Sequence, residues 1–134
     1  MTKFGFITKH RQIDFDVRRR DAQRQLDRAD RSTIPVILDL YGEQRMGLEQ
    51  HKFAFPADAT MSSVLSIVRK HAAPPIRETE SLTGIVLMFS SEDDVDPKQT
   101  LLCSSHTLAQ VHKTWASNDS NLYVIFCLEN VFGN

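Results

Sequence analysis

Cysteine and histidine are the residue types that could give this chain a catalytic nucleophile. Cys103 lies three residues before His106, and His112 follows, so a thiol and an imidazole base are close together in the sequence. Such a pair could activate a thiolate for covalent catalysis. However, His106 falls at a predicted loop-to-helix boundary, and no third residue stands out that would orient its ring. We therefore expect no enzymatic activity, and we interpret Cys103 and Cys127 as small buried apolar residues.

The same residues do not indicate a metal site. Structural zinc sites combine closely spaced pairs of Cys and His ligands, and the chain lacks such paired spacing. Two cysteines also cannot form a framework of disulfides, so both thiols are expected to be reduced. We expect neither a metal nor a cofactor.

Composition and charge restrict the classes of partner. The chain has 134 residues, 41% hydrophobic and 25% charged, which is typical of one globular domain. Residues 1–35 carry nine Lys and Arg against five Asp and Glu, a net charge of +4, and residues 36–134 carry seven against twelve, a net charge of −5. A basic end on an acidic body suits a protein partner or an anionic membrane face. It is too weakly basic to predict nucleic-acid binding.

The apolar runs are too short for a membrane span or a secretory signal. The longest run, residues 84–89, has six residues, whereas a helix that crosses a bilayer needs about 20. The first residues, Met1 to Phe6, contain no apolar stretch of the length that a signal peptide requires. We expect a cytoplasmic protein.

Hydrophobic periodicity predicts the elements that must position any functional residue. A helix begins near Asp14, and a proline at position 35 stops it. The expected elements in chain order are a helix over 14–31, strands over 35–40 and 51–55, a helix over 60–71, a strand over 85–89, a helix around 108–115 and a strand over 122–127. Residues 1–12 fit a short helix turn or a mobile arm, residues 72–83 fit a loop, and residues 92–97 fit a solvated turn.

After the leading helix, the order is strand, strand, helix, strand, helix, strand. This order predicts an α+β protein of the β-grasp, ubiquitin-like class, with one central helix packed across a four-stranded mixed sheet. We divide the chain into an N-terminal helical extension over 1–32, a β-grasp core over 33–127 and a flexible C-terminal tail over 128–134.

Several short motifs extend the likeness beyond topology. They are Phe15 to Arg20, Ile34 to Ile37, Lys52 to Asp58, Val68 to Lys70, Leu122-Tyr123, Glu129-Asn130 and Val131 to Gly133. In order and approximate spacing they resemble the ubiquitin-like modifiers of autophagy, the family that includes GABARAP and the yeast autophagosome-membrane modifier. The likeness covers nearly the whole chain.

The resemblance implies a role for the C-terminal end, Phe132-Gly133-Asn134. In the family, a cysteine protease removes any residue beyond the glycine, and an activating enzyme adenylates the exposed carboxylate. The acyl group then passes as a thioester to a conjugating enzyme and finally to an amine, most often that of phosphatidylethanolamine in the autophagosomal membrane. Glycine suits this chemistry because a residue without Cβ can thread a narrow channel and leaves its carbonyl open to attack.

The resemblance also implies a peptide-binding surface. Residues 52–55 would form an edge strand that pairs with an extended receptor peptide carrying an aromatic residue, two spacers and an aliphatic residue. One pocket would take the aromatic side chain, and its walls would be Leu26, Pro35, Lys52 and Ala54. The other would take the aliphatic side chain, and its walls would be Leu38, Phe53, Phe55, Val64 and Ile67. Pro56 and Arg69 belong to the same implied set. From spacing alone, Leu38 and Val64 are better explained as core residues.

Some residues depart from the family pattern and leave alternatives open. Asn121 stands where members usually have a pocket-lining aromatic residue, and together with Ala54 it makes the first pocket shallower or more polar. Asn121, Cys127 and the long loop over 72–83 favour the sister modifier, which is joined to a protein lysine as part of the autophagy ligase. A third alternative is a ubiquitin-like adaptor that is never conjugated.

The basic helix also has two interpretations, a solvated face or a contact for acidic peptide flanks and anionic lipid; its arginines are Arg18, Arg19, Arg20, Arg24 and Arg28.

Overall fold

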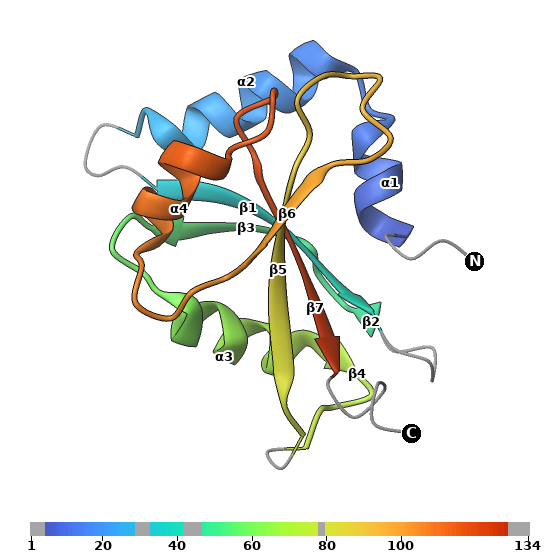
Figure 1. Cartoon of the computed structure of the whole chain (residues 1–134), viewed down its shortest axis with the longest axis vertical. Coiled ribbons are helices and arrows are strands. Elements are labelled where there is room, and N and C mark those ends of the chain that lie inside the picture. Colours follow the sequence, from blue (N-terminus) through green and yellow to red (C-terminus); the bar gives the residue numbers. More distant parts are fainter. Residues whose placement is uncertain (1–4, 29–32, 42–46, 78–79, 129–134) are drawn as a thin grey trace.

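The computed structural model describes residues 5–28, 33–41, 47–77 and 80–128 (Figure 1). In this part of the chain, seven strands and four helices follow one another. The helices are α1 (Gly5–Arg11), α2 (Phe15–Leu26), α3 (Met61–His71) and α4 (Leu108–Trp115), and the strands are β1 (Thr33–Tyr41), β2 (Gly47–Leu48), β3 (Lys52–Pro56), β4 (Ala72–Ala73), β5 (Leu82–Met88), β6 (Lys98–Leu101) and β7 (Leu122–Leu128).

Five strands form the main sheet in the order β3-β1-β7-β5-β6, and β2 pairs with β4 in a small second sheet. The neighbours β1 and β7 run parallel, whereas the other pairs of the main sheet are antiparallel. Every residue of β7 is buried, and so is all of β1 except Tyr41. Continuous apolar runs of this kind are expected of strands covered on both faces.

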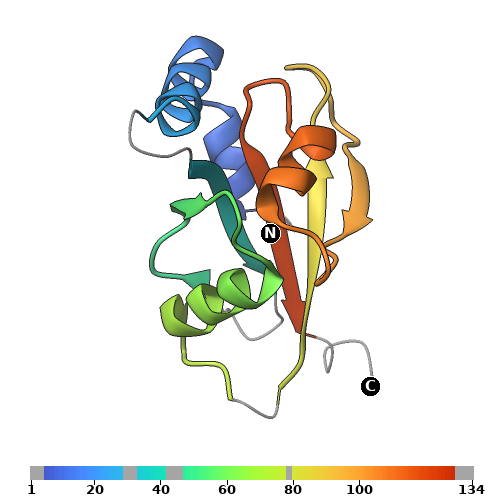
Figure 2. The same cartoon turned by 90° about the vertical axis from the view of Figure 1, so that its left-hand side faces the viewer.

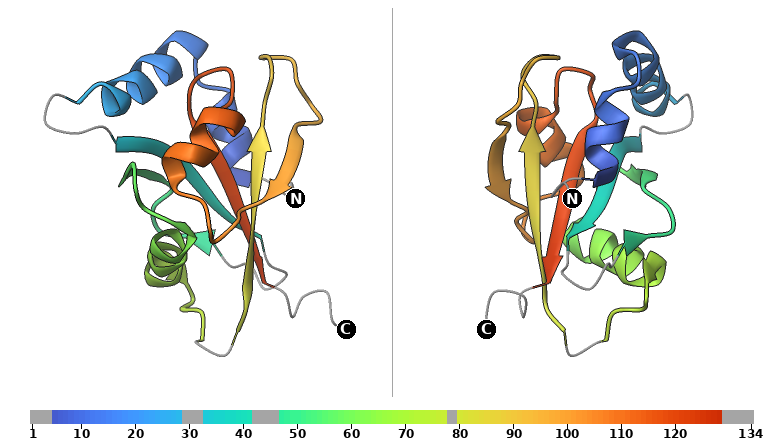
Figure 3. Two further views of the ribbon diagram at one scale, coloured as in Figure 1. Left: turned by 60° about the vertical axis from the view of Figure 1, so that its left-hand side comes forward. Right: turned by 90° about the vertical axis from the view of Figure 1, so that its right-hand side faces the viewer.

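The helices cover both faces of the sheet (Figures 2 and 3). On one face, α3 and α4 contribute Val64, Val68, Leu108 and Val111 to the larger core cluster. On the other face, α1 contributes Ile7 to a smaller cluster that includes Ile37, Leu87 and Ile125. Alternate residues of β1 and β7 therefore serve different cores, as the two-residue period of a strand requires.

The predicted β-grasp class is confirmed, with four corrections to its elements. Residues 72–83, expected as a loop, contain β4 and the start of β5, and Leu128, assigned to the tail, is the last residue of β7. The main sheet has five strands and not four, because β6 adds an edge strand that residues 98–101 do not reveal in the sequence. This strand is mostly exposed, and Leu101 is its only apolar residue. The basic helix ends at Leu26, before the predicted end near Arg31. Within the segment 1–12, for which the sequence left two choices, residues Gly5–Arg11 form helix α1, and residues 1–4 lie outside the described part of the chain.

A buried ionic cluster fastens the N-terminal helices to the body of the domain. Arg18 is 1% exposed and Asp119 is fully buried, and Arg18 Nε donates to Asp119 Oδ2 at 2.9 Å. Arg18 also donates to Glu92, and Arg11 donates to Asn118 Oδ1 at 2.9 Å. The solvated-face interpretation of the basic helix is therefore wrong for Arg18, because this arginine points inward to a carboxylate. Arg19, Arg20, Arg24 and Arg28 remain exposed.

Hydrogen bonds determine the charge states inside this cluster. Burial alone would raise the pKa of Asp119, but the hydrogen bonds from Tyr123, Arg18 and Asn121 together hold the pKa of this carboxyl below its ordinary value. Burial would lower the pKa of Arg18, and the hydrogen bonds to Glu92 and Asp119 outweigh it and raise that pKa instead. Both groups are therefore charged at neutral pH.

Gly84 is a position where a side chain has no room. A Cβ built on this residue would lie 2.7 Å from Cε1 of Phe126 and 3.3 Å from Cβ of Leu102, and the Phe126 ring is fully buried. We expect Gly84→Ala to lower the free energy of unfolding by about 1–3 kcal/mol through overpacking. Urea denaturation measures this change.

Gly47→Ala is the matched control for that measurement. A Cβ at Gly47 meets no atom within 4 Å in the described part of the chain. We expect this substitution to change stability by less than about 0.5 kcal/mol. Equal effects of the two substitutions would contradict the packing argument.

Candidate functional site

The most promising binding site is a cavity of about 330 Å³ where helices α1 and α2 meet strands β1 and β3. Its lining comes from four elements and from the residue before β7: His10 of α1, Arg18, Asp21, Ala22, Arg24 and Gln25 of α2, Pro35 and Ile37 of β1, Lys52, Phe53 and Ala54 of β3, and Asn121. The volume falls at the lower end of the range of small-ligand pockets. It therefore suits one large side chain of a partner.

The cavity brings together most of the residues predicted for the aromatic-accepting pocket. Pro35, Lys52 and Ala54 line it, as does Asn121, which is 4% exposed. Leu26 does not line it and packs instead against the larger core. The structure places Ala22 and Gln25 of the preceding helical turn in the wall.

Sequence reasoning missed several lining residues. His10, Asp21 and Ile37 contribute to the cavity. His10 and Asp21 belong to no recognisable motif, and Ile37 ends the motif Ile34 to Ile37 but is not among the residues predicted for the pocket. The period of α2 could have suggested Asp21 and Gln25, which lie one turn apart on the side of Ala22. No signal in the sequence could have brought His10 here, because its position depends on how α1 folds back onto the sheet.

Charged residues at the mouth of the cavity form weak ion pairs. Asp21 lies 3.4 Å from Nη1 of Arg24 and 4.0 Å from Nζ of Lys52. All three side chains are at least 40% exposed, and exposed pairs of this kind contribute about 0–1 kcal/mol. Arg24 and Lys52 are thus free to exchange Asp21 for an acidic group of a partner.

Strand β3 borders the cavity and forms one edge of the main sheet. Leu38 N–H donates to the His51 carbonyl at 2.8 Å, so these two residues form a hydrogen-bonded pair. Ile37 opposite Lys52 and Pro35 opposite Ala54 are then non-bonded pairs. In an antiparallel pair, hydrogen-bonded and non-bonded positions alternate. The backbone groups of Lys52 and Ala54 consequently point away from β1. The Lys52 carbonyl accepts there from Nε2 of the exposed Gln50 side chain at 3.2 Å, a contact that an added strand would replace.

The residues predicted for the aliphatic-accepting pocket are divided between core and surface. Leu38 and Val64 are fully buried and Phe55 is 6% exposed, so all three belong to the larger core. Phe53 and Ile67 are partly exposed and Pro56 is exposed, so these residues can contact a partner.

Arg69 holds the long segment after α3. Its Nη1 donates to the Arg77 carbonyl at 2.9 Å, and its Nη2 donates to the Glu80 carbonyl at 2.7 Å. This arginine therefore ties Arg77 and Glu80 to the C-terminal half of α3. The structure gives it a role in positioning this connection, at the far end of α3 from its N-cap.

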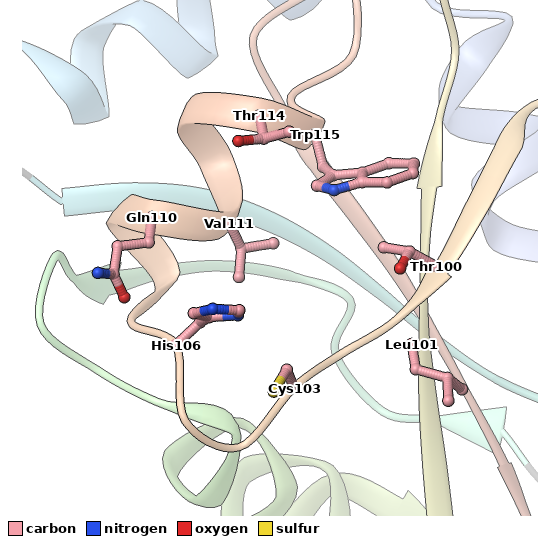
Figure 4. Close-up of a pocket in the computed structure, with 8 residues that line it drawn as sticks. All are labelled: Thr100, Leu101, Cys103, His106, Gln110, Val111, Thr114 and Trp115. Atoms are coloured by element: carbon pink, nitrogen blue, oxygen red, sulfur yellow. The ribbon is translucent and has the colours of Figure 1, made fainter.

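A second cavity of about 330 Å³ is lined by Cys103 and His106, the thiol and imidazole that the sequence places close together (Figure 4). It lies between β6 and α4, and Cys103, His106, Val111 and Trp115 are among its lining residues. The interpretation of Cys103 as buried is wrong, because it follows the edge strand β6 and is exposed, whereas Cys127 is buried. Neither cysteine forms a disulfide in the part of the chain that the structure describes.

The partner of the Cys103 thiol is a serine. Sγ of Cys103 lies 3.0 Å from Oγ of Ser105, and no hydrogen bond joins this thiol to the His106 ring in the described residues. The side-chain and backbone hydrogen bonds of Ser105 lower the pKa of this thiol below its ordinary value. This arrangement favours the thiolate without supplying a general base. The described residues also contain no group of three or more His, Cys, Asp or Glu that could hold a metal ion.

We expect a thiol-reactive probe at neutral pH to label Cys103 much faster than Cys127, because only an exposed thiolate reacts. Ser105→Ala should slow the labelling of Cys103, since it removes the hydrogen bond that lowers the thiol pKa. His106→Ala should leave the rate unchanged. Peptide mass mapping over time measures these rates, and a strong decrease in His106→Ala would instead favour a catalytic pair.

The predicted conjugation residues, Phe132, Gly133 and Asn134, lie outside the described part of the chain. Among the described helices, none is both long enough and apolar enough to cross a membrane.

Comparison with known proteins places this chain in a family. The model of the family described as "Autophagy protein Atg8 ubiquitin like" matches residues 18–133. Human "Microtubule-associated protein 1 light chain 3 gamma" is 26% identical over 102 residues, which cover 75% of this chain and 61% of that protein. The chain thus spans less than two thirds of the length of this relative.

A solved structure shares the fold. The crystal structure of Trypanosoma brucei ATG8 superposes with a TM-score of 0.66 and 22% sequence identity, and the alignment covers 88% of this chain and 90% of that chain. The resemblance found in the sequence is therefore confirmed. Because the family match extends over most of the chain, this chain belongs to the Atg8 family of ubiquitin-like autophagy proteins.

Proposed function

We propose that this protein is a conjugated modifier in autophagy. A protease would remove Asn134, and activating and conjugating enzymes would carry Gly133 as a thioester to phosphatidylethanolamine. The conjugate would act in autophagosome formation and in the recruitment of cargo receptors. The family match, which extends to residue 133, supports this chemistry. The protein would then be cytoplasmic, with a fraction on autophagosomal membranes.

The observation that carries receptor recruitment is the free edge of β3 beside a cavity. Lys52 and Ala54 present backbone groups to an added strand, and the cavity lies next to the same residues. A receptor peptide with an aromatic residue, two spacers and an aliphatic residue would extend the sheet and place its aromatic side chain in the cavity. Phe53 and Ile67 are partly exposed and would contact the aliphatic residue.

We also propose that the chain itself catalyses no reaction. The Cys103 thiol bonds to Ser105 and lacks an imidazole partner among the described residues. The enzymes of conjugation would supply the reactive cysteines, and this protein would supply the acyl group.

Titration of the isotope-labelled protein with such a peptide tests the docking surface. We expect amide shifts along residues 52–55 and at the residues that line the cavity. Ala54→Pro should weaken binding about two- to tenfold, because it removes one outward backbone donor worth about 0.5–1.5 kcal/mol. Proline is tolerated in an edge strand at a position whose N–H faces solvent.

Ala54→Ser is the matched control, because it changes the same side chain but retains the backbone donor, so it should bind more tightly than Ala54→Pro. A peptide in which both the aromatic and the aliphatic residue are alanine should not bind. Shifts that avoid residues 52–55 altogether would refute the docking surface.

A further inference from the structure

The innermost part of the β3-side cavity contains a histidine with one unused nitrogen. His10 is 3% exposed and lines this cavity. Its Nδ1 lies 2.9 Å from the hydroxyl oxygen of Tyr123, and this is the only hydrogen bond of the ring in the described part of the chain. In the described residues, every buried side-chain nitrogen or oxygen that is sealed from solvent has a partner. Nε2 is therefore not fully sealed, and the cavity is an open space that His10 lines.

The neighbours of His10 determine which nitrogen carries the proton. The Tyr123 hydroxyl donates its single hydrogen to Asp119 Oδ2 at 2.7 Å. Asp119 is a carboxylate, because hydrogen bonds keep its pKa low. The oxygen of Tyr123 must therefore accept the hydrogen bond from His10, and this requires a proton on Nδ1.

The second nitrogen is consequently a hydrogen-bond acceptor. Burial lowers the pKa of His10 to about 4, against an attraction to Asp119 that would raise it. At neutral pH the ring carries one proton, and that proton is on Nδ1. Nε2 then has a lone pair and no hydrogen. The cavity presents a deeply placed acceptor that lacks a partner in the described residues.

The depth of this acceptor indicates where a partner must carry its donor. His10, Arg18, Ala22 and Asn121 are each no more than 4% exposed, so they form the inner part of the cavity. Lys52 and Ala54 are exposed and lie at the mouth. A partner side chain that enters beside β3 and bonds to Nε2 of His10 therefore needs a long apolar part and a hydrogen-bond donor at its end.

We propose that this cavity selects tyrosine as the aromatic residue of the receptor peptide, with the tyrosine hydroxyl donating to Nε2 of His10. This inference rests on the proposed function, since it concerns the same docking surface. Pro35, Ile37 and Ala22 supply apolar walls for the ring. Phenylalanine has the same shape without the donor, so it would cover Nε2 and leave it unpaired. Tryptophan has its donor on the side of the ring system and not at the tip.

Three peptides that differ only at the aromatic position test this selectivity by calorimetry at neutral pH. We expect the tyrosine peptide to bind at least tenfold more tightly than the phenylalanine and tryptophan peptides. Tyrosine and phenylalanine peptides that bind along residues 52–55 with equal affinity would overturn the selectivity and leave the docking surface intact. Absence of binding by all three would overturn the proposed function together with it.

Two substitutions of His10 separate recognition from packing. His10→Asn retains a donor at the place of Nδ1 and removes the acceptor, so the tyrosine preference should fall to about unity. His10→Gln carries its amide as far as Nε2, where the oxygen can accept, and should retain part of the preference. Amide spectra establish that each variant is folded. An unchanged preference in folded His10→Asn would refute the role of His10.

A spectroscopic measurement on the wild type does not depend on any variant folding. The nitrogen shift of His10 Nε2 should be that of an unprotonated nitrogen in the free protein. It should move towards the value of a hydrogen-bonded nitrogen when the tyrosine peptide is added, and it should not do so with the phenylalanine peptide. Identical Nε2 shifts with both peptides would overturn the proposal.

Discussion

Replacement of Asp119 with alanine is expected to lower the free energy of unfolding by about 3–5 kcal/mol. The substitution leaves Arg18, which is 1% exposed, without its fully buried carboxylate partner. It also removes the acceptor of the Tyr123 hydroxyl. Arg18 would keep only Glu92, whose side chain is 41% exposed, as a carboxylate partner. A buried charge that loses its buried partner is among the most destabilising defects that one substitution can create. Urea denaturation measures the loss.

Asp21→Ala is the control for this prediction. Asp21 also pairs with basic side chains, at 3.4 Å from Arg24 and 4.0 Å from Lys52, but all three are exposed. We expect its removal to cost less than about 1 kcal/mol. Comparable losses for Asp119→Ala and Asp21→Ala would show that burial of the Arg18 pair contributes nothing.

The same cluster should make the wild type sensitive to acid. Hydrogen bonds lower the pKa of Asp119 and, chiefly through Arg18, the pKa of Glu92 in the folded state. A carboxyl with a depressed folded pKa stabilises the protein above its unfolded pKa and loses that contribution as the pH falls through the folded value. Stability should therefore decline below about pH 4, and Asp119→Ala should show a smaller decline.

Gly133→Ala is expected to abolish conjugation and leave the fold unchanged. The prediction depends on the chemistry of the acyl donor, because the added methyl group would crowd both the passage of the tail and the carbonyl under attack. A chain that ends at Gly133 is the matched control, and it should be conjugated without the protease. Intact-mass measurement of the N-terminally tagged proteins from starved cells gives the result, and a conjugate of the alanine variant would refute the assignment.

The mass of the wild-type product in the same experiment identifies the acceptor. A gain of one phospholipid supports the proposed lipid conjugate. A stable adduct with one protein would instead support the lysine-linked modifier, and an unchanged mass would support an unconjugated adaptor.

The central strands could be predicted from the sequence because both of their faces are buried. Residues 35–40 and 122–127 are apolar runs, and they form β1 and β7 almost as expected. The edge strand β6 could not be found in this way, because its exposed residues, Lys98 and Gln99 among them, have no apolar alternation. A buried strand requires apolar residues, and these are visible in the sequence. An exposed edge strand has little buried surface and therefore lacks this signal.

The residues of the β3-side cavity could likewise be predicted only where a sequence pattern marks them. The resemblance located Pro35, Lys52 and Ala54, which lie on strands with a clear pattern. The charge of Arg18 suggested a solvated residue, and only the approach of Asp119, a hundred residues away in the sequence, explains its burial. His10 depended on a further long-range contact, with Tyr123. Pairings of distant polar residues leave no periodic signal in the sequence.

Helix α1 both packs against the sheet and supplies a residue to the cavity. Its first turn is held by Asp39 of β1, whose Oδ2 accepts from the N–H groups of Phe6 and Ile7 at 3.0 and 3.4 Å. Its last turn supplies His10 to the cavity. A deletion of residues 1–11 would remove α1. It would uncover one face of the sheet and also remove His10, whose Nε2 is the proposed acceptor for the tyrosine hydroxyl. A protein without residues 1–11 would thus lose its preference for tyrosine peptides, although strand β3 itself would be unchanged.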